Sequence, residues 1–183
     1  MIPPNHYCAK TKDLPEDDPD KIFHDTMYGF PTTDDNQLFE RLMLEINQAG
    51  LNWSLIMKKH HNFRVAYDGF DIQKVAQYDD QDVERLMNDA GIIRHKQKIH
   101  AAIFNAQKIL DIRNDHGSFA SWLEQHHPAS EAEWTKLFRS HFKFTGPEIV
   151  KEFLMGIGYL PGAHHPECPV DQKLERLRTA PDR

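Results

Sequence analysis

The stretch Gln37–Lys59, QLFERLMLEINQAGLNWSLIMKK, constrains the fold of this chain more than any other. Its apolar residues recur at helical spacing from Leu38 to Ala49, which predicts an amphipathic helix. Gly50 is placed to end that helix, and Trp53 follows at the start of a second helical pattern. The stretch therefore predicts a helix, a glycine stop and another helix, in that order.

One carboxylate in this stretch has an unusual position. On a helical wheel, Glu45 lies at the edge of the apolar stripe, beside Leu38, Leu42 and Ala49. With the indole of Trp53 nearby in sequence, it could hold a flat, hydrogen-bonding or cationic ligand. Periodicity alone favours the more ordinary interpretation, in which the glutamate at the edge of the core and the tryptophan within it have structural roles.

Length and charge limit the class of protein. The 183 residues are enough for one domain with a real core, or for two small lobes. The formal net charge of −6 argues against a protein that coats nucleic acid without specificity, although it leaves room for a local basic face. No apolar run is long enough to span a bilayer, and the N-terminal sequence MIPPNHYCAK has no signal-peptide core. We therefore expect a cytoplasmic protein with no membrane partner.

The remaining sequence pattern is helical. Prolines and an acidic cluster predict irregular structure for residues 1–20, and residues 21–33 are typical of a loop that packs onto the core. Asp34 or Asp35 can cap the helix that follows, and about eight helices alternate with turns up to residue 157. No segment has a convincing strand pattern, so the sequence predicts an all-α fold.

Two segments favour contact with phosphate. Residues 91–113 carry five basic residues and one acidic residue, a local charge of +4, and the basic ones gather at the start of a helix, where backbone N–H groups point outward. The segment 131–157 resembles a helix-hairpin-helix, in which Gly146 would permit close approach of a phosphate and Lys143 would add charge. A solvated helix face and an ordinary helical hairpin are the structural alternatives.

Cysteine and histidine near the two ends of the chain form a candidate metal site. His164 and Cys168 are four residues apart, so both could reach one ion, and Cys8 and His24 would complete a Cys₂His₂ set. Four protein ligands of these types suit a closed, structural, tetrahedral zinc site that ties the N-terminal arm to the C-terminal arm. From spacing alone, other histidines remain possible ligands, namely His165 or His6.

Taken together, several segments resemble one family. They are FHDTMYGFP (23–31), LFERLMLEINQAGLNWSLIMKKHHNFRVAY (38–67), DVERLMNDAGIIRHKQKIHAAIFNAQ (82–107), FKFTG (142–146) and the His-x-x-x-Cys tail. In this order they are similar to DNA-3-methyladenine glycosylase I, a base-excision repair family of the helix-hairpin-helix DNA glycosylase superfamily. The resemblance implies a two-lobed helical fold that flips the damaged base into a pocket between the lobes. It also implies one glycosylase domain over residues 1–170, followed by a charged, loosely ordered tail over 171–183.

The resemblance also assigns residues. It implies that Glu45 hydrogen-bonds the base and is the catalytic residue, that Trp53 stacks on the base, and that Phe23 and Tyr28 border it. It implies a structural zinc held by Cys8, His24, His164 and Cys168. The residues expected to hold DNA are Arg94, Lys96, Lys98, Lys143, Thr145 and Gly146.

This chain departs from the family pattern at the base-binding positions. Phe23 stands where the family has a tyrosine whose hydroxyl contacts the base, and Tyr28 stands where a tryptophan is usual. Loss of one polar contact can change substrate selectivity strongly. We therefore expect these positions to affect which damaged base is removed, and not the fold.

The function implied is hydrolysis of the N-glycosidic bond of 3-methyladenine in alkylated double-stranded DNA by a monomeric enzyme without strand cleavage. An alternative is a non-catalytic or altered-specificity protein that binds damaged DNA on the same scaffold. A third interpretation is a zinc-containing helical interaction domain with no DNA role. Release of free base separates the first two, and salt-dependent binding to duplex DNA separates both from the third.

Overall fold

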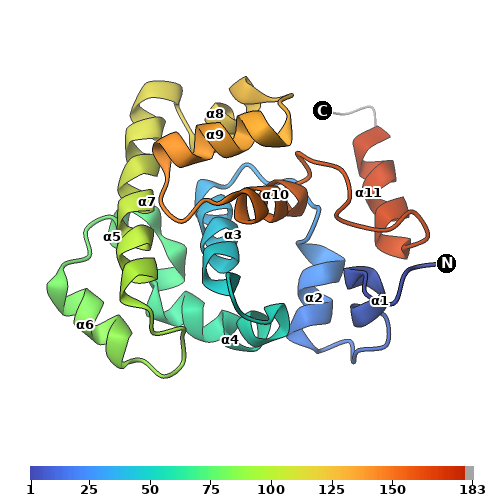
Figure 1. Cartoon of the computed structure of the whole chain (residues 1–183), viewed down its shortest axis with the longest axis horizontal. Helices are drawn as coiled ribbons and strands as arrows, with labels where there is room; N and C mark the ends of the chain where they lie inside the picture. Colours follow the sequence, from blue (N-terminus) through green and yellow to red (C-terminus); the bar gives the residue numbers. More distant parts are fainter. Residues whose placement is uncertain (180–183) are drawn as a thin grey trace. The chain divides into compact units, whose positions relative to one another are not determined.

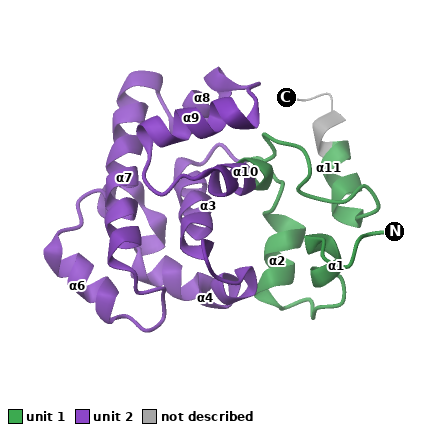
Figure 2. Ribbon diagram, viewed as in Figure 1, with its two compact units in different colours: residues 1–31, 154–183 green, residues 32–153 purple. Residues whose placement is uncertain are grey.

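A computed structural model describes residues 1–179 of the chain. Within these residues it has eleven α-helices, one 3₁₀ helix and no strand, which confirms the all-α prediction (Figure 1). The chain divides into two compact units (Figure 2). The central unit comprises residues 32–153, and the terminal unit comprises residues 1–31 together with the segment from Leu154 onward. No helix of the described part is long and apolar enough to cross a membrane.

The helices follow the chain in a simple order. The terminal unit contains α1 (Tyr7–Thr11), α2 (Pro19–Thr26) and α11 (Pro169–Thr179). The other elements, which begin in the central unit, are α3 (Asp35–Gln48), α4 (Trp53–Ala66), η1 (Asp68–Phe70), α5 (Ile72–Val75), α6 (Asp80–Asn88), α7 (Lys96–His116), α8 (Phe119–His126), α9 (Glu131–His141) and α10 (Pro147–Gly156). The last three residues of α10 belong to the terminal unit.

Helix α3 is the centre of the central unit. It packs against α4, η1, α5, α7 and α8, and its apolar side chains are almost completely buried. Asp34 starts the helix, because its carboxylate accepts hydrogen bonds from the backbone N–H groups of Asn36 and Gln37, at 2.8 and 3.3 Å. The helix ends at Gln48, and Gly50, two residues further on, has a φ of +81°, a conformation that glycine adopts without strain.

Burial around α3 extends to polar side chains, which have partners. The carboxylate of Asp35 caps α8 by accepting from the N–H groups of Phe119 and Ala120, at 2.9 and 3.0 Å, and it also binds Arg113. The carboxylate of Glu40, which is 1% exposed, accepts from His60 and Arg64 of α4. A buried charge needs such partners, because water no longer solvates it.

The sequence prediction for residues 1–33 was wrong, because helices α1 and α2 form there. Proline does not prevent α2, since Pro19 occupies its first position, where the missing N–H breaks no helical hydrogen bond. The Asp18 carboxylate caps this helix by accepting from the Asp20 N–H at 2.9 Å. Near the other end, α11 is helical within the segment expected to be loosely ordered, and residues 180–183 lie outside the described residues.

Candidate functional site

Glu45 lines a hollow in the central unit. The residue lies in the last turn of α3, is 7% exposed, and faces a space of about 340 Å³ between α3 and the first half of α10. The lining residues are Glu45, Gln48, Ala49, Gly50, Gly146, Pro147, Glu148, Ile149 and Glu152. The hollow thus joins the two features that the sequence singled out, the glycine stop after α3 and the turn before α10.

The carboxyl group of Glu45 is electrostatically unusual. Its side chain makes no hydrogen bond or ion pair with any described residue, unlike the carboxylates of Asp35 and Glu40 on the same helix. Burial raises the pKa of Glu45 well above its ordinary value, and the negative charge of Glu152 raises it further. A buried carboxyl group that lacks a protein partner and borders a hollow is suited to a positively charged ligand.

The other predicted base-binding residues are divided between the units. Trp53 is the first residue of α4 in the central unit, is partly exposed, and is not among the residues that line the hollow. Phe23 and Tyr28 belong to the terminal unit, where both are buried and their ring centroids lie 6.2 Å apart.

A buried asparagine supports the turn between α9 and α10. The side chain of Asn105, on α7, donates to the carbonyl oxygen of Lys143 at 3.1 Å and accepts from the Lys143 N–H at 2.8 Å. Thr145 is buried, and its hydroxyl donates to the Phe142 carbonyl oxygen at 3.2 Å, so this side chain stabilises the turn from within. Phe144 protrudes, 39% exposed, with a φ of +59°. Asn105 therefore fixes the backbone of the turn.

Backbone donors are available where this turn enters α10. The first helical hydrogen bond runs from the Val150 N–H to the Gly146 carbonyl oxygen, at 3.0 Å. The N–H groups of Glu148 and Ile149 precede it and have no acceptor among the described residues. A side chain added at Gly146 would meet no atom within 4 Å. The turn is therefore open to a large ligand.

The basic residues expected to hold phosphate differ in exposure. Arg94, Lys96 and Lys143 are exposed, and the Lys143 ammonium lies 4.5 Å from the ring centroid of Phe104. Lys98 lies on α7, which runs beside α3 (Figure 1), is only 6% exposed, and donates to two carbonyl oxygens at the end of α3. Burial makes the Lys98 side chain unsuitable for gripping phosphate.

Lys98 instead caps α3. Its ammonium group donates to the carbonyl oxygens of Asn47 and Ala49, each at 3.0 Å. These carbonyl groups lie at the helix end, where the unpaired acceptors and the helix dipole favour a positive charge. Since Ala49 and Gly50 line the hollow, the hydrogen bond from Lys98 to the Ala49 carbonyl oxygen helps to fix the backbone on that side of the hollow.

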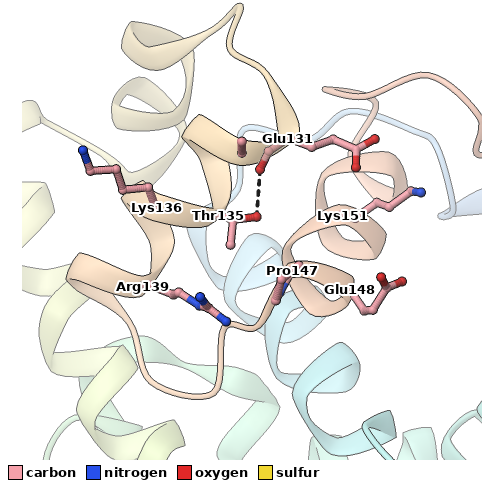
Figure 3. A pocket seen from close by; sticks show the side chains of 8 residues that line it. Glu131, Thr135, Lys136, Arg139, Pro147, Glu148 and Lys151 are labelled. Carbon is pink, nitrogen blue, oxygen red and sulfur yellow. Dashed lines mark hydrogen bonds between the residues drawn. The ribbon is translucent and has the colours of Figure 1, made fainter.

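A second hollow of about 600 Å³ lies between α9 and α10 (Figure 3). Its lining residues are Glu131, Ala132, Thr135, Lys136, Arg139, Pro147, Glu148 and Lys151. Figure 3 shows Arg139 extending toward Pro147, while the Thr135 hydroxyl donates to the Glu131 carbonyl oxygen at 2.7 Å. The lining charges are mixed and mostly exposed, which is typical of a solvated helix face.

Four buried side chains of the terminal unit form a cluster that could hold a metal ion. Cys8, His24, His164 and Cys168 present ligand atoms that all lie within 4.8 Å of one another. The two histidine nitrogens are 3.2 Å apart, and the nitrogen–sulfur distances that involve His164 are 3.6 and 4.0 Å. Around a tetrahedral zinc ion the corresponding separations are about 3.3 and 3.6 Å. The geometry therefore fits a tetrahedral ion of this size.

The surroundings of the cluster orient its imidazoles. The Nε2 atom of His164 lies 2.7 Å from the Tyr28 carbonyl oxygen, and Nδ1 of His24 lies 2.6 Å from the Asp25 carboxylate. These contacts leave the other ring nitrogens free to face the cluster, as in metal sites with an outer shell of acceptors. Burial lowers the pKa of His164, which favours the neutral form that binds metals. Burial raises the pKa of the Cys8 thiol to about 12, and a divalent cation would reverse that effect.

The alternative ligands lie outside this cluster. Nδ1 of His6 accepts from the Cys8 N–H at 3.2 Å and so caps α1, while Nδ1 of His165 accepts from the Glu167 N–H at 3.1 Å. The Nδ1 atom of each ring is thus engaged locally. Among the described residues, the structure favours the original four ligands.

Three functional features could not be read from the sequence. Glu152 is one of several charged residues on an amphipathic helix, and no local pattern marks it as facing Glu45. Asn105 and Lys98 contact partners 38 and about 50 positions away along the chain. Only the helical periodicity of α7, which directs both side chains inward, gave a partial signal.

Comparison with known proteins agrees with this fold. A family model of methyladenine glycosylases matches residues 15–171. DNA-3-methyladenine glycosylase 1 of Escherichia coli (strain K12) is 37% identical, over 74% of this chain and 83% of that protein. The relatives are therefore DNA glycosylases.

Two solved structures are similar over most of their length. One is a tyrosine-to-phenylalanine variant of 3-methyladenine DNA glycosylase I in complex with 3-methyladenine, with a TM-score of 0.77 and 32% identity, covering 90% of this chain and 96% of that one. The other is 3-methyladenine DNA glycosylase I of Staphylococcus aureus, with a TM-score of 0.76 and 31% identity, covering 85% and 93%. This chain belongs to the methyladenine glycosylase family, that of DNA-3-methyladenine glycosylase I.

Proposed function

We propose that this protein hydrolyses the N-glycosidic bond of 3-methyladenine in alkylated double-stranded DNA. The observation that carries the proposal is the carboxyl group of Glu45, which is buried on α3, lacks a partner among the described residues, and borders a hollow. The solved structures to which this chain is similar are named 3-methyladenine DNA glycosylase I, and one of them is a complex with 3-methyladenine.

Charge explains how such a site would select its substrate. Methylation at N3 makes the base cationic while it is attached to DNA. A buried, unpaired carboxylate is unfavourable by itself, and the cationic base supplies the missing opposite charge. Neutral adenine supplies no such charge. Glu45 therefore favours the damaged base, and Trp53 is proposed to stack on its face.

The reaction needs little chemical assistance from the protein. The C1′–N9 bond breaks with its electron pair passing to the base, which leaves as neutral 3-methyladenine. Water adds to C1′ and loses one proton, so the positive charge of the substrate becomes the released proton. The enzyme has to extrude the nucleotide, which costs a few kcal/mol of unstacking, and to hold it near Glu45. No lysine lines the hollow among the described residues, which supports a glycosylase without strand cleavage.

The turn between α9 and α10 is proposed to act as a helix-hairpin-helix that binds DNA phosphate. Support comes from the unpaired N–H groups of Glu148 and Ile149 and from the open space at Gly146. Exposed Arg94, Lys96 and Lys143 are proposed to add positive charge. Lys98 is withdrawn from this role because it is buried, and Thr145 is proposed to contribute through its backbone only.

Phe23 and Tyr28 remain proposed base-binding residues. Phe23 offers no hydroxyl group, so any hydrogen bond that the family tyrosine makes has no counterpart from this side chain. A tyrosine-to-phenylalanine variant of a relative was solved with 3-methyladenine, so base binding in this family survives at least one exchange of that type. We therefore propose a reduced polar contact rather than loss of activity.

We also propose that Cys8, His24, His164 and Cys168 hold a structural zinc ion. The support is the donor set, the buried cluster and its distances. The ion would supply structural cross-linking only, by joining α1 and α2 to the segment that precedes α11. We further propose that the protein is monomeric and acts in the cytoplasm.

Release of free base tests the proposed function. The purified protein is incubated with methylated duplex DNA, and free 3-methyladenine is measured by chromatography. We expect release well above that of buffer alone. Binding to the same DNA without release would instead support the second candidate, a damage-binding protein on this scaffold. That candidate is kept because Phe23 replaces the family tyrosine.

A further inference from the structure

We propose that Glu152 is a second recognition residue, which acts with Glu45 to select positively charged alkylated purines over neutral bases. This inference rests on the proposed function and assigns a part of the site that the resemblance does not include. Its basis is the position of Glu152 in the hollow, the charge it places there, and the engagement of neighbouring charges elsewhere.

Glu152 lies on the face of α10 that borders the hollow. Glu152 follows Glu148 and Ile149 by one helical turn, so these three residues share one face of α10. That face lines the same hollow of about 340 Å³ as Glu45. Glu152 is partly buried, whereas Glu148 is exposed at the start of the helix, where water screens its charge.

Glu152 also affects the electrostatics of Glu45. Its negative charge is, after burial, the other cause that raises the pKa of Glu45. The two carboxyl groups therefore repel each other when both are ionised. A cation between them would relieve this repulsion, whereas a neutral base would leave it unchanged.

Several other charged side chains near α3 are bound by protein partners. The Lys98 ammonium of α7 is bound to two carbonyl oxygens, and Arg113 of α7 is bound to Asp35. On α4, His60 and Arg64 are bound to Glu40. None of these cationic groups lines the hollow, where the described charged residues are Glu45, Glu148 and Glu152. The charged side chains that line the hollow are thus all acidic, which suits a cationic purine.

Neutral and charge-conserving variants of the full chain test the proposal. Glu152→Gln and Glu152→Ser remove the charge, Glu152→Asp keeps it, and Glu84→Gln makes the same change in net charge at an exposed site on α6. The thermal midpoint of each variant is measured first. If one neutral variant unfolds at the assay temperature, the other provides the comparison.

Inhibition of base release measures the selection directly. The inhibitors are a permanently charged 3,9-dialkyladeninium ion and neutral adenine. We expect both neutral variants of Glu152 to weaken inhibition by the cation about threefold to tenfold, a range that follows from one Coulombic contact in a partly hydrated site. Inhibition by adenine should change less than twofold, and Glu152→Asp and Glu84→Gln should resemble the wild type.

The pH dependence of kcat/KM gives an independent measure. If Glu45 acts as a carboxylate, activity falls as pH drops through its pKa. Removal of the Glu152 charge should move this acidic limb to lower pH, and Glu152→Asp should not. An unchanged limb with unchanged cation selectivity would overturn the role of Glu152, as would slower excision without either effect. Absence of release by the wild type would instead overturn the proposed function.

Discussion

At the scale of single residues, α3 contains two kinds of buried carboxyl group. Asp35 and Glu40 are ion-paired and hydrogen-bonded, so these contacts offset the free-energy cost of burying their charges. Glu45 has neither kind of partner among the described residues, and burial disfavours its charge. A buried carboxyl group without a partner is expected to lower the stability of the folded protein, and ligand recognition is a reason for it to be there. The presence or absence of a protein partner therefore distinguishes structural from functional carboxylates on this helix.

Stability at different pH values tests this description of Glu45. Because its pKa is raised in the folded protein, the folded state holds the proton more tightly, and the resulting stability is lost as pH rises above the ordinary value of 4.5. Glu45→Gln cannot ionise. We expect its thermal midpoint to exceed that of the wild type near pH 8, and the difference to shrink toward pH 4. A lower midpoint for the variant throughout would contradict the description.

Lys98 differs from its sequence interpretation in a way that can be measured. Lys98→Met removes the cap on α3 and should lower the free energy of unfolding by about 1–3 kcal/mol, the range for hydrogen bonds to a charged group. Denaturant titration measures this change. The slope of log affinity against log salt for duplex DNA should stay the same, because a buried ammonium releases no counterion.

The matched control is an exposed lysine of the proposed phosphate surface. Lys143→Met should leave the unfolding free energy within about 0.5 kcal/mol and reduce the salt slope by about 1. The opposite pattern, with a changed slope for Lys98→Met alone, would return Lys98 to the DNA surface.

At the scale of elements, the turn between α9 and α10 separates two uses of glycine. Gly50 has a positive φ that favours glycine, whereas Gly146 has no such requirement and no atom near its missing side chain. Gly146 is therefore explained by what approaches it from outside. This distinction predicts different consequences for the same substitution.

Gly146→Ala should leave the thermal midpoint close to that of the wild type and weaken duplex DNA binding roughly fivefold, the effect of about one lost backbone contact. Gly50→Ala should lower stability by about 1 kcal/mol through backbone strain. Fluorescence anisotropy at fixed salt and thermal unfolding measure the two effects. Unchanged DNA affinity for Gly146→Ala would argue against phosphate binding at this turn.

The elements that the sequence predicted best have strong periodicity and clear end signals. Helix α3 begins after Asp34 and α10 begins at Pro147, as expected from the capping pattern and the proline. Helices α1 and α2 differ from the prediction of irregular structure, because proline interrupts a helix only in its interior and Pro19 stands at the first position of α2. Local sequence rules describe helix ends well and short capped helices poorly.

Site prediction failed where tertiary contact decides the role. Lys98 lies in a basic cluster by sequence, but helix α7 directs it into the core against the end of α3. The proposed role of Glu152 depends on α10 and α3 lining one hollow, which no local pattern indicates. In contrast, the four cysteine and histidine residues were identifiable by type, and only their convergence required the structure.

At the scale of the whole molecule, the proposed metal site joins residues from opposite ends of the sequence. Cys8 and His164 are 156 positions apart in the sequence, and the Sγ atom of Cys8 lies 3.6 Å from Nδ1 of His164. Closing so long a chain segment without a cross-link is entropically unfavourable, so a bound ion is expected to stabilise the terminal unit strongly.

Metal analysis checks this expectation. Protein purified without chelator should contain about one zinc ion per chain, and removal by a chelator should lower the thermal midpoint. Cys168→Ala should lose the metal, while His165→Ala, which changes a neighbouring histidine outside the cluster, should retain it. Full metal content in Cys168→Ala, or none in the wild type, would contradict the four-ligand site.

The central claim is that Glu45 reads the cationic base, and single-turnover release of 3-methyladenine tests it most directly. Wild type and Glu45→Gln are compared in excess over methylated duplex DNA, with folding and DNA affinity measured in parallel. We predict that the variant stays folded, binds DNA as the wild type does, and releases base at least about 100-fold more slowly, as for loss of a major electrostatic contact. Equal rates for the two proteins would contradict the claim.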